Sequence, residues 1–184
     1  MNSKEFRHRV LAPFVIDVDP NKVTALSLTM GIGSGVLFAF NYILLGAIIL
    51  SLSGFLDLLD GEIAKTKGKT SKKGDIFDHL GDRIVDASIF GGIAFSSYAA
   101  VEYGLVTAVM VLMISYLGTQ SQAVLGKRLY KGIMGRFPRT VSLIALCLAA
   151  VLIDQRFLYY GIIVMLGFAT LTVLQRIWEI HKRI

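Results

Sequence analysis

Residues 23–56 read VTALSLTMGIGSGVLFAFNYILLGAIILSLSGFL, with no charged side chain between Lys22 and Asp57. A transmembrane helix needs about 20 largely apolar residues, so this stretch is too long for one helix. The pair Asn41-Tyr42 divides it, which predicts two membrane spans at roughly 21–41 and 43–65. The stretch therefore indicates a chain that crosses a bilayer in consecutive antiparallel helices.

The rest of the 184-residue chain repeats this pattern, since 54% of it is hydrophobic and only 17% is charged. A soluble domain typically has roughly 25% charged residues. Further apolar stretches predict four more spans, at about 75–100, between Glu102 and Lys127, at about 137–153 and at about 157–178. We expect an all-α integral membrane protein whose six transmembrane helices form one domain, residues 20–184.

Positive charge is distributed unevenly over the predicted connections. Of the 19 Lys and Arg residues, 17 fall on one side of the predicted membrane. The positive-inside rule assigns this side, with both termini, to the cytoplasm. The net charge of +6 is therefore a topology signal, and we do not expect nucleic acid as a partner.

Residues 1–19 are too polar to cross the membrane. Phe6, Val10, Leu11 and Phe14 recur at helical spacing among basic residues. This pattern predicts an amphipathic helix that lies on the cytoplasmic interface before the first span.

The acidic residues concentrate in residues 56–86, LDLLDGEIAKTKGKTSKKGDIFDHLGDRIVD, which hold seven of the 13 in the chain. Asp57 and Asp60 are three apart near the end of the second span. Asp78 and Asp82 are four apart near the start of the third. Each pair shares one helix face. Because the intervening loop is short, the two helices are expected to be neighbours whose acidic faces converge.

Four carboxylates at the end of a membrane domain indicate function, because charge in this environment is costly. The carboxylates repel one another, and two divalent cations such as Mg²⁺ or Mn²⁺ would neutralise them with oxygen ligands. Paired ions suit phosphoryl transfer, where they neutralise phosphate oxygens and hold the attacking and leaving groups in line. The spacing predicts a two-metal site formed by Asp57, Asp60, Asp78 and Asp82.

The same region resembles the CDP-alcohol phosphotransferase family, whose pattern is D-x2-D-G-x2-A-R-x8-G-x3-D-x3-D. The chain matches every spacing, with Lys65 in place of the family's Arg, at Asp57, Asp60, Gly61, Ala64, Lys65, Gly74, Asp78 and Asp82. The resemblance implies a membrane enzyme of phospholipid synthesis with residues 20–184 as its catalytic domain. Such an enzyme transfers a phosphatidyl-type or archaetidyl group from a CDP-lipid to an alcohol and releases CMP. The resemblance also implies a homodimer.

The resemblance further implies roles for individual residues. Asp57, Asp60 and Asp78 would hold the metals, and Asp82, which also reaches a metal, would act as the general base for the acceptor hydroxyl. The residues implied to face the CDP moiety are Asn21, Thr24, Asp57, Gly61, Ala64 and Lys65. At that position Lys keeps the positive charge of Arg but lacks its planar fork of donors.

The acceptor is predicted from the second cytoplasmic loop, GKRLYKGIMGRFPRT at residues 126–140. Its Arg136 and Arg139 are three apart at the mouth of the fifth span, and Arg pairs are well suited to bind phosphate. This loop resembles the Gly-rich R-x2-R stretch of relatives that use inositol phosphate, so inositol 1-phosphate is the favoured phosphorylated polyol. Residues 117–120 lack an Arg that many relatives carry, and glycerol phosphate therefore stays an alternative.

Two other classes of function also use such residues. A divalent-cation transporter would place its carboxylates near the bilayer midplane, in broken helices of repeated halves. The carboxylates of this chain lie toward the span ends, and the sequence shows no repeat. A non-catalytic lipid-binding scaffold would tolerate loss of the motif, whereas all four Asp residues are present.

Overall fold

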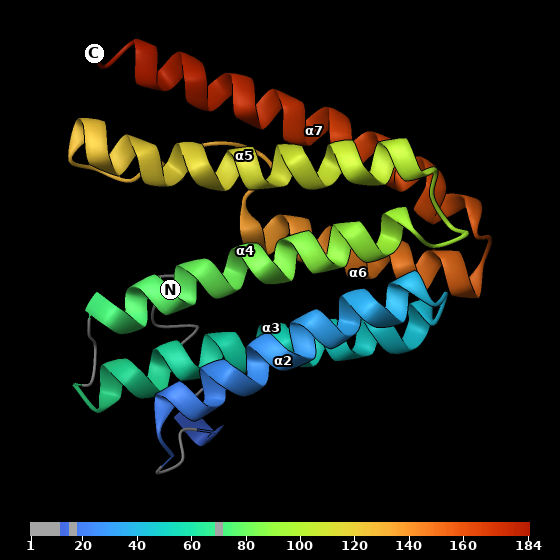
Figure 1. The fold of residues 1–184 in the computed structure, drawn as a ribbon, viewed down its shortest axis with the longest axis horizontal. Coiled ribbons are helices and arrows are strands. Elements are labelled where there is room, and N and C mark those ends of the chain that lie inside the picture. The colour runs from blue at the N-terminus through green and yellow to red at the C-terminus, as the bar shows by residue number, and fades with distance from the viewer. Residues whose placement is uncertain (1–11, 15–17, 69–71) are drawn as a thin grey trace.

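The computed structural model describes residues 12–14, 18–68 and 72–184 (Figure 1). The described residues form helices and no strands, which confirms the all-α prediction. A short 3₁₀ turn, η1, comes first, and six α-helices follow: η1 (Ala12–Phe14), α2 (Pro20–Ala39), α3 (Ile43–Thr66), α4 (Lys72–Ala94), α5 (Val101–Leu125), α6 (Arg136–Leu152) and α7 (Arg156–His181).

The two helices predicted from residues 23–56 are present. The residues just before each helix, or in its first turn, favour a helix start at that position. Pro20 lies in the first turn of α2, where a missing N–H breaks no helical hydrogen bond. The carboxylate of Asp19 caps this turn by accepting from the backbone N–H of Asn21 at 3.0 Å. Asn41 has a φ of +66°, a left-handed conformation that Asn tolerates, and this reverses the chain into α3.

The third predicted span differs from the structure, because α4 ends at Ala94 and does not continue to residue 100. The hydroxyl of Ser96 donates to the carbonyl of Ile93 at 2.7 Å, and the side chain of Asn41 accepts from the backbone N–H of Ser97 at 2.7 Å. These polar contacts tie the turn after α4 to the connection between α2 and α3. They end the helix earlier than hydrophobicity alone indicates.

The amphipathic helix expected over residues 1–19 lies largely outside the described residues. Of that range, the structure describes residues 12–14 and 18–19. The ring of Phe14 in η1 packs edge to face against Phe55 of α3, with ring centroids 5.3 Å apart. This contact places η1 beside the middle of α3.

The six helices run back and forth and pack in layers, with α5 and α7 on one side, α2 and α3 on the other, and α4 and α6 between them (Figure 1). The start of α2, the end of α7 and the α3–α4 and α5–α6 connections lie at one end of the molecule. Within the part of the chain that the structure describes, four helices, α2, α3, α5 and α7, are long and apolar enough to cross a membrane. The charged residues of α4 that the structure describes, from Asp75 to Asp86, lie in the first two thirds of the helix.

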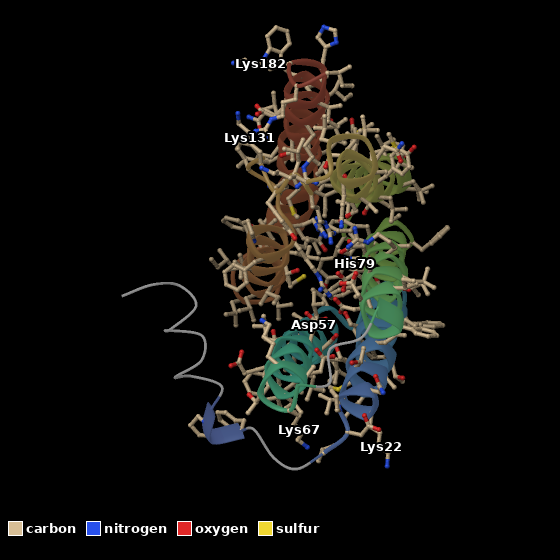
Figure 2. All side chains as sticks on the ribbon, turned by 90° about the vertical axis from the view of Figure 1, so that its left-hand side faces the viewer. Lys22, Asp57, Lys67, His79, Lys131 and Lys182 are labelled. Carbon is tan, nitrogen blue, oxygen red and sulfur yellow. The ribbon has the colours of Figure 1, made fainter. Side chains whose placement is uncertain are left out.

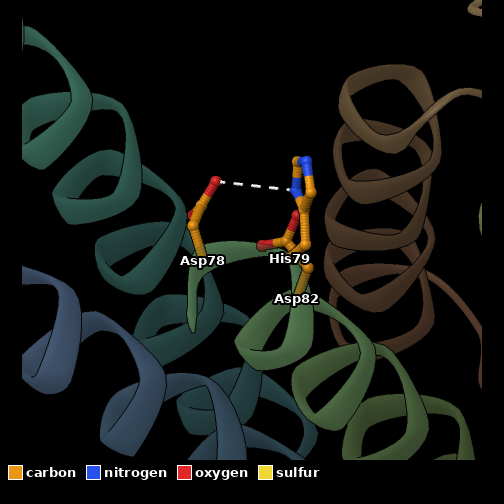
Figure 3. Close-up of side chains that lie close together, drawn as sticks. All are labelled: Asp78, His79 and Asp82. Carbon is orange, nitrogen blue, oxygen red and sulfur yellow. Dashed lines mark ion pairs between the residues drawn. The ribbon is translucent and has the colours of Figure 1, made fainter. Parts of the chain in front are cut away.

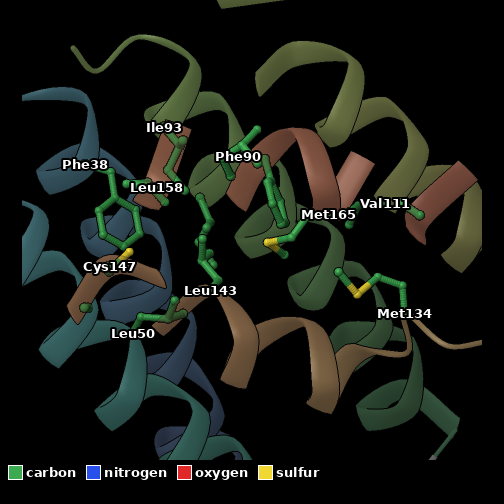
Figure 4. Close-up of a cluster of buried hydrophobic side chains, with 14 of the residues drawn as sticks. Phe38, Leu50, Phe90, Ile93, Val111, Met134, Leu143, Cys147, Leu158 and Met165 are labelled. Carbon is green, nitrogen blue, oxygen red and sulfur yellow. The ribbon is translucent and has the colours of Figure 1, made fainter. Parts of the chain in front are cut away.

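The buried core joins these layers and fixes where α4 lies (Figure 4). Phe38 of α2, Phe90 of α4 and Cys147 of α6 belong to one continuous cluster, and each is at most 1% exposed. Between α2 and α4 the backbones touch: a Cβ added to Gly92 would lie 1.9 Å from the carbonyl oxygen of Gly35. Small residues allow this close approach of helices. The contact holds α4 against α2, with its acidic residues beside α3 and α6.

Candidate active site

Carboxylates from α3 and α4 converge at the end of the bundle where α3 stops. Asp57 of α3 and Asp82 of α4 both contact the same guanidinium nitrogen of Arg136, at 3.0 and 2.6 Å. Arg136 begins α6, so three helices meet at this point. Figure 2 looks onto this end and shows Asp57 and His79 between the helices, with Lys22, Lys131 and Lys182 around them.

Asp60 lies one helical turn from Asp57 and is only 6% exposed. The hydroxyl of Thr24 in α2 donates to the carbonyl of Pro20 at 3.0 Å, and the carboxylates of Asp57 and Asp78 repel that of Asp60. The Oδ2 atom of Asp60 is buried and has no hydrogen-bond partner among the described residues. A buried carboxylate oxygen without a donor is costly, and a cation satisfies it.

On α4, Asp78, His79 and Asp82 each offer a ligand atom within 4.8 Å of the others (Figure 3). His79 is not among the site residues predicted from the sequence, where its only signal is its place beside Asp78. The imidazole lies 3.9 Å from the carboxylate of Asp78 and 3.5 Å from that of Asp75. Carboxylate oxygens are the ligands preferred by Mg²⁺ and Mn²⁺, so the donor set fits a divalent cation.

The two arginines expected to share one anion have different partners. Arg136 contacts Asp57 and Asp82, as described above. Arg139 is only 2% exposed, and its Nη2 lies 2.7 Å from both carboxylate oxygens of Asp86. Two ion pairs therefore join α6 to α4, one helical turn apart, and the inner pair is closed off from solvent.

The residues implied to face the CDP moiety lie on neighbouring turns of α2 and α3. Asn21 and Thr24 belong to the first turns of α2, whereas Gly61, Ala64 and Lys65 belong to the last turns of α3. A Cβ added to Gly61 would meet no atom within 4 Å, so there is open space beside this glycine.

A further contact ties the two segments together beyond these turns. The ammonium of Lys67 donates to the carbonyl of Val18 at 2.9 Å and joins the start of α2 to the end of α3. This contact holds side by side the two segments implied to face the CDP moiety.

The family of the chain is shown by comparison with known proteins. Residues 18–174 match the model of the CDP-alcohol phosphatidyltransferase family, and the chain belongs to this family. The archaetidylinositol phosphate synthase of Pyrococcus horikoshii is 30% identical over 170 residues, covering 92% of this chain and 87% of that protein. The archaetidylinositol phosphate synthase of Methanothermobacter thermautotrophicus is 31% identical over 147 residues, covering 80% and 75% of the two chains.

Solved structures share the fold. The phosphatidylinositol phosphate synthase of Mycobacterium tuberculosis with CDP-DAG bound superposes with a TM-score of 0.83 at 22% identity, covering 94% of each chain. The same protein in complex with manganese and citrate gives a TM-score of 0.81 at 21% identity, covering 95% of this chain and 88% of that one. The chain is accordingly a membrane-embedded transferase of phospholipid synthesis.

Proposed function

We propose that the protein transfers a phosphatidyl-type or archaetidyl group from a CDP-lipid to inositol 1-phosphate and releases CMP. The observation that carries the proposal is the meeting of Asp57 and Asp82, from two helices, on one nitrogen of Arg136. An arginine beside the carboxylates of the family motif supports the binding of a phosphate there. The names of the two archaeal relatives favour inositol phosphate over glycerol phosphate, which is the alternative acceptor.

Two divalent cations, Mg²⁺ or Mn²⁺, are proposed to bind to Asp57, Asp60, Asp78 and Asp82. The buried, unpartnered oxygen of Asp60 supports this assignment. When bound, such ions neutralise phosphate oxygens and hold the reacting groups in line.

Asp82 is the proposed general base. The acceptor hydroxyl gives its proton to Asp82, and its oxygen forms a bond to the lipid-linked phosphorus of the CDP-lipid. The bond from that phosphorus to CMP breaks, and CMP leaves with the electron pair. Asp82 suits this role because Arg136 and Arg83 hold its two oxygens, at 2.6 and 3.3 Å, and so fix its orientation.

Donor binding is proposed for Asn21 and Thr24 on α2 and for Gly61, Ala64 and Lys65 on α3. The open space beside Gly61 supports close approach of the nucleotide to the backbone. Lys65 is exposed at the end of α3, where a flexible ammonium suits a phosphate oxygen.

Acceptor binding is proposed for Arg136 and Arg139, in different ways. Arg136 is partly exposed and contacts the acceptor phosphate directly. Arg139 lies one turn further along α6, and its pair with Asp86 holds Arg136 in place. This division follows from burial, because a guanidinium that is 2% exposed has no free face for a soluble ligand.

The proposed setting is a homodimer of chains that each cross the membrane six times, preceded by the interfacial helix of residues 1–19. The active site faces the cytoplasm. The positive charge of the connections at the end that holds the carboxylates supports this orientation.

CMP release by the purified protein tests the proposal. The reaction contains a CDP-lipid and Mg²⁺ or Mn²⁺, with inositol 1-phosphate, glycerol phosphate, serine or no acceptor in separate samples. Release that depends on inositol 1-phosphate is expected. No release with any acceptor, from protein that keeps its helical content, would favour the scaffold or the transporter instead.

A further inference from the structure

The connection between α5 and α6, residues 126–135, leads directly to Arg136. It forms no helix or strand of its own, so its path depends on contacts with other elements. Gly135 precedes α6, and no side chain among the described residues caps this helix by a hydrogen bond. The position of the start of α6, and with it of Arg136, is therefore set by neighbouring elements.

One face of α7 holds the backbone of this connection at two points. The guanidinium of Arg176 donates to the carbonyl of Lys131 at 2.9 Å. The hydroxyl of Thr172 accepts from the backbone N–H of Met134 at 3.0 Å. Positions 172 and 176 are four apart and so lie on the same face of the helix. The contact at Met134 comes two residues before Arg136, so it is the one that bears most directly on the site.

The contact between Thr172 and Met134 is closed off from solvent. Thr172 is 0% exposed and Met134 is 5% exposed, and the side chain of Met134 belongs to the buried core cluster (Figure 4). The hydroxyl of Thr172 also donates to the carbonyl of Phe168 at 2.8 Å, which fixes its orientation. A Cβ added to Gly132 would lie 2.3 Å from Cγ2 of Thr172, so the connection touches this side chain. A buried N–H that loses its acceptor is costly, and the chain must shift to pair it elsewhere.

We propose that Thr172 is a positioning residue for the transfer reaction: its hydroxyl holds Met134 and so sets where Arg136 meets Asp57 and Asp82. The guanidinium nitrogen lies 3.0 and 2.6 Å from these carboxylates, a geometry that a displacement of about 1 Å would disrupt. The proposal rests on the proposed function, in which Arg136 contacts the acceptor phosphate and orients Asp82. Thr172 touches no substrate and acts through Arg136.

Steady-state kinetics of CMP release separate this role from a purely structural one. Thr172→Val keeps the shape of the side chain but removes its oxygen, whereas Thr172→Ser keeps the oxygen. Thr170→Val is the matched control, because Thr170 lies on the same helix and its hydroxyl donates to the carbonyl of Leu166 within that helix, at 2.9 Å.

Thr172→Val is expected to raise the KM for inositol 1-phosphate and to lower kcat/KM for this acceptor about tenfold or more. The KM for the CDP-lipid should stay unchanged, since the residues proposed to bind the donor lie on α2 and α3. Thr172→Ser and Thr170→Val should keep the wild-type constants. A structural role alone would reduce the fraction of active protein, and hence the apparent kcat, with both KM values unchanged. That result would overturn the proposal.

A double-variant cycle tests whether Thr172 acts through Arg136. In an Arg136→Lys background, Thr172→Val should cause little further loss of kcat/KM, because the residue that it positions has already been changed. Losses that multiply in full would contradict the proposal.

Hydrogen–deuterium exchange tests the contact without turnover. The backbone amides of residues 134–137 should exchange about tenfold faster in Thr172→Val than in the wild type or Thr170→Val, and unchanged exchange would overturn the proposal. If Thr172→Val does not fold, Gly132→Ala decides the matter, since its Cβ would push the connection away from Thr172 and should give the same result. Failure of the wild type to release CMP would refute the proposed function, and the exchange result would then decide by itself whether Thr172 holds the start of α6.

Discussion

Removing Arg139 tests the buried ion pair that joins α6 to α4. The side chains of Arg139 and Asp86 are 2% and 6% exposed, and their charged groups meet at 2.7 Å. Arg139→Met keeps an unbranched apolar side chain but leaves Asp86 buried without its counter-ion. Breaking a buried pair in this way costs about 3–5 kcal/mol. For a chain of this size about 2–4 °C is lost per kcal/mol, so the melting temperature should fall by roughly 6–20 °C.

The double variant Asp86→Leu/Arg139→Met separates lost charge pairing from lost packing. Replacing a whole buried ion pair by apolar residues is often neutral, so the double variant should recover most of the stability. Thermal unfolding in detergent, followed by circular dichroism, measures each variant. Lys182→Met, which removes an exposed cation near the end of the chain, is the control and should leave the melting temperature unchanged.

Two results would refute this reasoning. Arg139→Met could melt with the wild type, which would mean that the pair with Asp86 adds nothing to stability. The double variant could also be as unstable as the single one, which would assign the loss to packing and not to an unpaired charge.

Three further predictions concern the site and the helix packing. Asp82→Asn should lower kcat by about 10²–10⁴-fold with CDP-lipid binding retained, whereas Asp75→Asn, on an exposed residue of the same helix, should leave CMP release unchanged. Removal of divalent cations with EDTA should abolish CMP release, and added Mg²⁺ or Mn²⁺ should restore it. Gly92→Ala should destabilise the bundle by about 1–3 kcal/mol, because its Cβ would overlap the carbonyl of Gly35, whereas Gly33→Ala meets open space and should be neutral in thermal unfolding.

Much of the fold could be predicted from the sequence, because a bilayer requires long uncharged helices and leaves few alternatives. The uncharged residues 23–56 and their division at Asn41 predicted α2 and α3. The end of α4 was less predictable. It depends on the side chain of Asn41 accepting from Ser97, which is a contact across the fold and not a property of the local sequence.

For the site, the sequence alone determined which carboxylates share a helix face, because positions three and four apart always do so. It also predicted that the helices of Asp57 and Asp82 would be direct neighbours, whereas α2 packs against both α3 and α4, and Arg136 of α6 joins the two carboxylates. The sequence did not determine which basic side chain contacts each of the acidic residues or His79. Arg136 lies 79 positions from Asp57, and Arg128 lies 49 positions from His79. Only the tertiary structure decided these partners, because they depend on how α4 and α6 align, and the packing of the buried core sets that alignment.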